Sequence, residues 1–186
     1  MTKLQKFFIA LTLFAMTYML YTIANYWRAD ILYAKGKYLN KSSDFISAQI
    51  VLTRAIKISP NEPYYHLELS ESYLNLDFPE KAILKSQKAI ELSPANVNLK
   101  RALFSTYIRL STDDPKYLIN AVATLEEAIK MAPTDAKLYY NLGLAYVRIG
   151  QIDRAIEILR KTIEMKPNYN EAKLALEYLL NDIIAK

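Results

Sequence analysis

The fold is decided by the stretch AKLYYNLGLAYVRIGQIDRAIEILRKTIEMKPNY, which spans residues 136–169. It holds two apolar runs with helical spacing, Leu138 to Ile149 and Ile152 to Met165. Gly150 separates the two runs, and Pro167 ends the second one. Large and small residues alternate along the runs, so that two antiparallel helices can approach closely and interdigitate. The stretch therefore predicts a packed pair of helices.

This stretch resembles the tetratricopeptide repeat, a helix–turn–helix unit of 34 residues with a known pattern of large and small residues. The residues that match the pattern are Tyr139 in the Trp slot, Leu142 and Gly143 in the Leu-Gly slot, Tyr146 in the Tyr slot, then Ala155, Leu159 and Pro167. The resemblance implies an all-α chain in which such pairs stack into a right-handed α-solenoid.

Four proline-terminated copies of the pattern follow one another along the chain. The closing prolines are Pro60, Pro94, Pro133 and Pro167, at spacings of 34, 39 and 34 residues. They predict repeats at 29–62, 63–96, 97–135 and 136–169, with a five-residue insertion near residues 111–115 of the third.

Residues 170–186 are expected to form a C-terminal capping helix. Its apolar residues cover more of its surface than a solvent-facing cap needs: Leu174, Leu176, Tyr178, Leu179, Leu180, Ile183 and Ile184. Either the helix has a further partner, or its leucines wrap the fourth repeat.

Residues 1–28 are predicted to form a membrane anchor. The run from Phe7 to Trp27 has no charged residue and, at about 1.5 Å per residue, is long enough to cross a hydrocarbon core of about 30 Å. The competing interpretation is a cleaved signal peptide, with a basic start and a small-residue site at 22–24. The run continues to Trp27 without a helix breaker, which favours an uncleaved anchor, and nothing before Lys35 forces a break from the first repeat.

The side of the membrane on which the repeats lie is open. Basic residues beyond the run, from Arg28 to Lys41, favour repeats in the cytoplasm. The short basic start followed at once by the apolar run is typical of a signal anchor, which would place the repeats outside it. We expect a single-pass protein with extracytoplasmic repeats and keep the cytoplasmic placement as the alternative.

The composition argues against chemistry in this chain. It has no cysteine, three glycines and one histidine, His66, which leaves little material for a catalytic triad, a metal site or a phosphate-binding loop. His66 is expected to be packed and hydrogen-bonded between helices. Acidic and basic residues are interspersed, and the formal net charge is +5, so no nucleic-acid surface is indicated. We expect no enzymatic activity, cofactor or metal.

The resemblance to tetratricopeptide repeats implies a concave groove lined by the first helix of each repeat. The expected ligand contacts are Arg101, Ser105, Arg109, Lys137, Asn141 and Arg148. In the second repeat the corresponding positions are Tyr64, Glu68, Glu71 and Asn75. The cations favour an acidic peptide or acidic glycan as the ligand, and the alternative is a mixed solvated surface.

A narrower resemblance covers Trp27 to Tyr73, which is similar to the tail of bacterial O-antigen ligase/polymerase-type membrane proteins. The residues that carry it are ADILYAKG at 29–36 and NEPYYH at 61–66, together with the longer third repeat. In that family a last membrane helix passes straight into the repeats. Their multi-span catalytic region has no counterpart here, so no catalytic residue is carried over. The resemblance implies an accessory role in assembly of the cell envelope or of surface polysaccharide.

Together these observations predict a non-enzymatic, membrane-anchored scaffold that binds a protein or peptide partner, which is expected to be acidic. The alternative is a structural subunit that self-associates into a homo-oligomer or filament through its apolar terminal helices.

Overall fold

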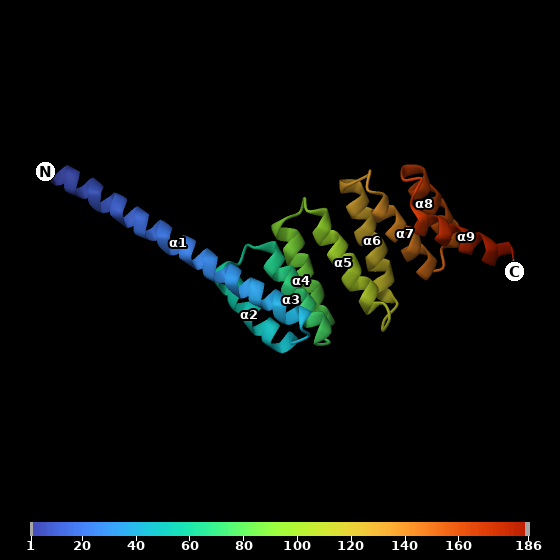
Figure 1. Cartoon of the computed structure of the whole chain (residues 1–186), viewed down its shortest axis with the longest axis horizontal. Coiled ribbons are helices and arrows are strands. Elements are labelled where there is room, and N and C mark those ends of the chain that lie inside the picture. Colours follow the sequence, from blue (N-terminus) through green and yellow to red (C-terminus); the bar gives the residue numbers. More distant parts are fainter. Residues whose placement is uncertain (1, 185–186) are drawn as a thin grey trace. The chain divides into compact units, whose positions relative to one another are not determined.

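The computed structural model describes residues 2–184, and within them the chain forms nine α-helices and no strand (Figure 1). The helices are α1 (Lys3–Lys41), α2 (Phe45–Ile58), α3 (Pro63–Asn75), α4 (Pro79–Leu92), α5 (Val97–Leu110), α6 (Lys116–Met131), α7 (Ala136–Arg148), α8 (Ile152–Met165) and α9 (Asn170–Ile184). The predicted all-α class is confirmed. Successive helices pack in pairs, α1 with α2, α3 with α4, α5 with α6 and α7 with α8. The ranges predicted for the second, third and fourth repeats each contain one pair, whereas the first contains α2 and only the last part of α1. The repeat boundaries stay predictions.

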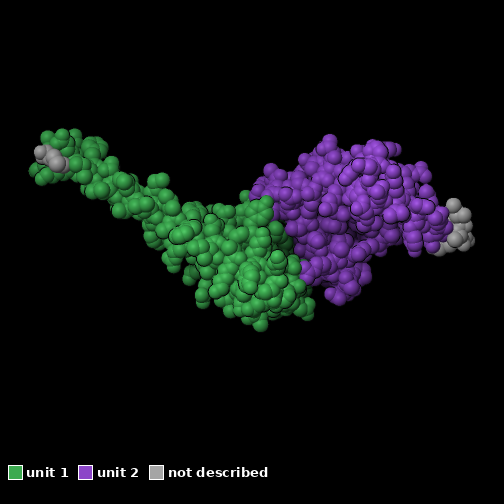
Figure 2. Space-filling model, viewed as in Figure 1, with its two compact units in different colours: residues 1–92 green, residues 93–186 purple. Residues whose placement is uncertain are grey.

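The chain divides into two compact units, residues 1–92 and residues 93–186 (Figure 2). Unit 1 contains α1 to α4, and unit 2 contains α5 to α9.

In unit 1, α1 is one unbroken helix of 39 residues, so the predicted continuity between the apolar run and the first repeat is confirmed. Its first part is exposed on all sides, whereas Ala29, Gly36 and Asn40 are buried against the rest of the unit. Among the described helices, α1 is the one that is long and apolar enough to cross a membrane, judged by length and composition.

In unit 2, the core lies where α7 and α8 cross, and small residues let the two helices approach. A Cβ atom on Gly143 would lie 2.9 Å from Leu159 Cγ and 3.6 Å from the Ala155 carbonyl oxygen. Ala155 and Leu159 are fully buried. The small residues of the repeat pattern are therefore at the helix crossing, as the sequence predicts.

The turns inside the repeats follow one design with one exception. Ser43, Asp77 and Gly150 each adopt a positive φ, between 60° and 77°, in the turn between the two helices of their repeats. The third repeat differs at residues 111–115, where the sequence predicts an insertion. There the Asp114 carboxylate accepts a hydrogen bond of 3.0 Å from the backbone N–H of Lys116, the first residue of α6, and Pro115 occupies the N-cap position.

The last helix, α9, packs on α8 with one face. Ala172 and Leu179 are buried there, and Leu176 is half-buried. Leu174 and Tyr178 are 66% and 73% exposed on the other side. Of the two interpretations of this helix, wrapping of the fourth repeat accounts for Leu176 and Leu179 and leaves Leu174 and Tyr178 uncovered in the monomer. The side chains of Ile183 and Ile184 lie outside the described residues.

Candidate functional site

The six predicted ligand contacts lie on α5 and α7, the first helices of the third and fourth repeats, and all belong to unit 2. Asn96 caps α5 by accepting from the Asn98 N–H at 3.1 Å, and Asp135 caps α7 by accepting from the Lys137 N–H at 3.0 Å. The two helices therefore begin at fixed positions, and their exposed side chains can be compared turn by turn.

A small cavity lies between α5 and α7 and includes two of the predicted residues. It measures about 200 Å³ and is lined by Phe104 and Ile108 of α5 and by Asn141, Leu144, Ala145 and Arg148 of α7. The lining is apolar apart from the Asn141 amide and the Arg148 guanidinium. Such a cavity can hold one apolar side chain while its polar groups bind carbonyl or carboxylate oxygens.

Arg101 is engaged within the protein. Its guanidinium forms an ion pair with Asp135 and donates a hydrogen bond of 2.9 Å to the Asn98 side chain. The side chain is 30% exposed, and its Nε is buried without a hydrogen-bond partner. Because Asp135 also caps α7, Arg101 ties α5 to the beginning of α7. Its charge is balanced, so it is a structural link more than a ligand contact.

The remaining predicted residues are not brought into the cavity. Lys137 is exposed and lines a different depression of about 700 Å³, together with residues of the α8–α9 turn such as Lys166 and Tyr169. Ser105 and Arg109 are exposed on α5 outside both linings. Of the six predicted ligand contacts, Asn141 and Arg148 line the same cavity, and the other four do not.

The apolar residues that line the cavity are not among the ligand contacts predicted from the sequence. Phe104 stands in the glycine slot of the third repeat, where a large side chain cannot enter the helix crossing, and Ile108 follows one turn later on the same face. Both are half-buried. A large residue in a slot that normally holds glycine is the signal that could have located the cavity.

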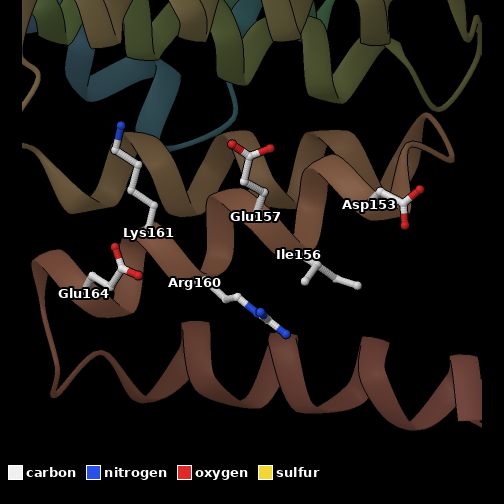
Figure 3. Close-up of a pocket in the computed structure, with 6 residues that line it drawn as sticks. All are labelled: Asp153, Ile156, Glu157, Arg160, Lys161 and Glu164. Atoms are coloured by element: carbon white, nitrogen blue, oxygen red, sulfur yellow. The ribbon is translucent and has the colours of Figure 1, made fainter.

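A further depression, of about 430 Å³, runs along the outer face of α8 (Figure 3). Its lining comes from α8 alone and carries both signs of charge: Asp153, Ile156, Glu157, Arg160, Lys161 and Glu164. In Figure 3, Arg160 points toward the helix below while Glu157 and Lys161 point the other way. Its three carboxylates and two cations are interspersed along a single helix, so this face offers no binding groups that converge from different elements.

The acidic residues predicted for the second repeat lie in unit 1. Asn40 Nδ2 donates to the Glu68 carboxylate and to its backbone oxygen, both at 2.9 Å, and Ser72 donates to Asn40 Oδ1 at 2.8 Å. Asn75 Nδ2 donates to the Glu71 carboxylate at 2.8 Å. Glu68 therefore helps to fix α3 on α1.

His66 is a packed imidazole, as predicted. It is 4% exposed, and its Nε2 lies 2.8 Å from the Pro60 carbonyl oxygen. Burial lowers the pKa of the ring, and the nearby charges of Lys85 and Lys88 lower it further, while the bond to Pro60 acts in the opposite direction. Within the described residues, no group of three or more His, Cys, Asp and Glu side chains could hold a metal ion.

Comparison with known proteins agrees with this architecture. The family model described as tetratricopeptide repeat matches residues 14–179. Two curated relatives are the interferon-induced protein with tetratricopeptide repeats 2 of Mus musculus and the protein O-mannosyl-transferase TMTC3 of Homo sapiens. The first is 28% identical over 124 residues, or 64% of this chain and 25% of that protein. The second is 27% identical over 149 residues, or 78% of this chain and 16% of that protein.

The chain thus spans a quarter or less of the length of these relatives. Among solved structures, the crystal structure of MamA protein superposes with a TM-score of 0.67 at 26% identity, covering 83% of this chain and 81% of that one. The family match, the repeated helix pairs and the superposition agree, and the chain belongs to the tetratricopeptide-repeat family.

Proposed function

We propose that this chain is a membrane-anchored adaptor that binds a peptide segment of a partner protein in the cavity between α5 and α7. The observation that carries the proposal is the lining of that cavity, which is apolar apart from one amide and one guanidinium. The Asn141 amide can both donate to and accept from a peptide backbone. Arg148, exposed at the last turn of α7, can bind a carboxylate with two parallel hydrogen bonds.

The expected ligand is a segment with an aliphatic side chain next to an acidic one. A cavity of about 200 Å³ holds one such apolar side chain and is too small for a drug-sized ligand. The acidic residue of the ligand is expected to bind Arg148, the cation that lines the cavity. Arg101 is already paired with Asp135. The ligand is therefore recognised by one cation, where the sequence suggested a cluster.

A binding experiment with matched variants tests the cavity. The full-length chain is purified in mild detergent and applied to arrays of ten-residue peptides that vary in their aliphatic and acidic positions. We expect Arg148→Glu and Leu144→Gln to reduce binding of the acidic-aliphatic peptides by at least about tenfold, which corresponds to about 1.4 kcal/mol. The matched control is Arg160→Glu, which makes the same charge change on the outer face of α8. Equal binding by all variants would contradict the proposed site.

Membrane attachment is the second part of the proposal and rests on the apolar run and the length of α1. Carbonate washing of membranes should leave the full chain in the pellet with Met1 retained. Release into the soluble fraction, or a mature N-terminus at Asn25, would contradict an uncleaved anchor. Cysteine labelling from either side of sealed vesicles, at an introduced Ser42→Cys, would determine on which side the repeats lie. We propose the extracytoplasmic side.

A role in assembly of the cell envelope or of surface polysaccharide is proposed from the resemblance of residues 27–73 alone. Identification of partners that co-purify from membranes tests it, because a glycan-handling membrane protein is expected among them. Self-association is the competing function, supported by the exposure of Leu174 and Tyr178 on α9. Light scattering of the wild type and of a Leu174→Glu, Tyr178→Glu variant would distinguish an oligomer from a monomer.

A further inference from the structure

The junction between the apolar run and the folded part of unit 1 is very short. Trp27, the last residue of the run, is 69% exposed, whereas Ala29 is fully buried against other helices. Both lie in the same unbroken helix, so about 3 Å of helix rise separate them. A bilayer around the run would therefore meet the packed helices directly, with no linker between them.

The turn between α2 and α3 lies at the level of this junction. Ala29 packs with Ala55 and Tyr65, and Ile58 joins the same cluster. The rings of Tyr33 and Tyr65 stack at 4.9 Å, and the Tyr65 hydroxyl donates to the Asp30 carboxylate. Residues 59–62 form the turn that follows Ile58, and Figure 1 shows this turn beside α1 where α1 leaves the other helices.

The C-terminal half of α4 lies at the same end of the unit. The Ser70 hydroxyl donates to the Ala82 carbonyl and lies 2.7 Å from the Ser86 hydroxyl, which places residues 82–86 beside the middle of α3. One turn earlier on α3, His66 is hydrogen-bonded to the Pro60 carbonyl oxygen, and the positive charges of Lys85 and Lys88 are close enough to lower the pKa of its ring. The last turns of α4 therefore adjoin the α2–α3 turn.

This end of unit 1, which we call the anchor-side surface, carries an excess of positive charge. The residues are assigned to this end by their positions along the helices: beside Ala29 on α1, in the last turns of α2, at the beginning of α3 and in the second half of α4. The cations are Arg28, Arg54, Lys57, Lys85 and Lys88, and the carboxylates are Asp30, Glu62 and Glu91. The Asp30 carboxylate accepts a hydrogen bond from the Tyr65 hydroxyl, and Glu91 forms an ion pair with Lys88 at 3.0 Å. That ion pair offsets one cation and one carboxylate, so the excess comes from Arg28, Arg54, Lys57 and Lys85 against Asp30 and Glu62. The opposite end, at the α1–α2 and α3–α4 turns, has the reverse balance, with Lys41 and Lys81 against Asp44, Asp77 and Glu80.

We infer that the anchor-side surface of unit 1 lies on the bilayer and binds anionic phospholipid headgroups through these basic side chains. The inference rests on the proposed membrane span and adds a second, electrostatic attachment. Lysine and arginine near an anionic leaflet are attracted over about a Debye length, roughly 10 Å, and the short junction keeps this surface within that distance. The aromatic residues Tyr26 and Trp27, both exposed on α1, then lie at the headgroup level.

The absence of cysteine allows a direct test with single-cysteine variants of the full chain. Asn61→Cys places a label in the α2–α3 turn, and Ser42→Cys places one in the α1–α2 turn at the other end of unit 1. Both variants are labelled with a small fluorophore and reconstituted into phosphatidylcholine vesicles with and without 30% phosphatidylglycerol. Quenching by a headgroup-attached nitroxide lipid is then measured. We expect strong quenching at position 61, increased by phosphatidylglycerol, and weak quenching at position 42.

Charge reversal separates electrostatic binding from mere proximity. Lys57→Glu with Lys88→Glu should abolish the increase that phosphatidylglycerol causes at position 61. The matched control, Lys37→Glu with Lys41→Glu on the exposed surface of α1, should retain it. All four lysines are exposed, so the helical circular dichroism signal is expected to be unchanged.

The outcomes distinguish this inference from the proposed anchor. A chain that carbonate removes from the vesicles would contradict the span, and the inference would fall with it. An inserted chain with equal, weak quenching at positions 61 and 42 would overturn the inference and leave the anchor intact. Quenching at 61 that does not respond to phosphatidylglycerol would overturn the role of the basic side chains.

Discussion

Gly36 and Leu52 meet so closely in unit 1 that a Cβ atom at position 36 would lie 2.4 Å from Leu52 Cγ. Leu52 is fully buried, so it cannot move aside freely. Gly36→Ala should therefore lower the free energy of unfolding by about 1–3 kcal/mol, although alanine is the better helix former. Chemical denaturation of the full chain in detergent measures the change.

A double-mutant cycle shows whether the steric contact is the cause. In a Leu52→Ala background the space at position 36 is open, and Gly36→Ala should then be neutral or stabilising by up to about 1 kcal/mol. A penalty of equal size in both backgrounds would mean that the close approach of α1 and α2 is not responsible.

Ala155, on the second helix of its pair in unit 2, is a small residue that is fully buried beside the α7–α8 crossing. Ala155→Leu is expected to cost about 1–3 kcal/mol because the added atoms overpack the contact. The control is Ala123→Leu at an exposed position of α6, where the same change should have an effect within about 0.5 kcal/mol. If thermal unfolding of Ala155→Leu equals that of the wild type, the repeat register in this part of the chain is wrong.

His66 should make stability depend on pH below its ordinary pKa of 6.5. Its pKa is lowered in the folded state, chiefly by burial, so the unfolded chain binds the proton more readily and stability is lost as the pH falls below that value. Protonation would also add a hydrogen to Nδ1, which is buried without a hydrogen-bond partner.

The melting temperature measured between pH 7.5 and 5.5 tests this expectation. It should fall more for the wild type than for His66→Gln, and because the chain has one histidine the difference belongs to that ring. Parallel curves for the two proteins would show that His66 does not titrate within this range.

The link between Arg101 and Asp135 gives a fourth prediction. Asp135→Ala removes both the ion pair and the cap of α7, so it should cost about 1–2 kcal/mol more than a neutral surface change. Arg101→Met keeps the cap and removes the ion pair together with the hydrogen bond to Asn98; the partly exposed ion pair is expected to contribute about 1 kcal/mol or less. Thermal unfolding at low and high salt distinguishes the contribution of the ion pair from that of the cap, because salt screens the ion pair more strongly. Equal losses in both variants would assign no role to the cap.

Most of the fold could be predicted from the sequence because the repeat signals are local. The spacing of the closing prolines and the small residues Gly36, Gly143 and Ala155 predicted the pairing of helices, and the structure places these residues at the crossings. The unbroken course of α1 was also predictable, since no glycine or proline precedes Gly36. The sequence does not decide whether the apolar residues of α9 cover the fourth repeat or contact a further partner, because that depends on how α9 packs against α8.

The candidate site was only partly predictable, because charge alone does not say which side chains are already engaged. Arg101 and Arg148 have the same side chain on corresponding helices, yet Asp135 is within reach of the first and the second lines the cavity. Pairing of that kind is decided 34 residues away along the chain and has no local signature. Asn141 directly precedes Leu142 of the repeat pattern, so the sequence places it beside the expected groove, whereas the position of the Phe104 side chain depends on tertiary packing.

The absence of a joint in α1 also has a mechanical consequence. A helix of 39 residues is about 58 Å long, and its two ends can only rotate together. For the proposed span, a bilayer thinner than the apolar run is accommodated by tilting the helix. The α2–α3 turn would then be pressed toward the membrane or lifted from it as the helix leans, so bilayer thickness would set the orientation of unit 1. Placing two glycines between Trp27 and Arg28 would uncouple the two movements.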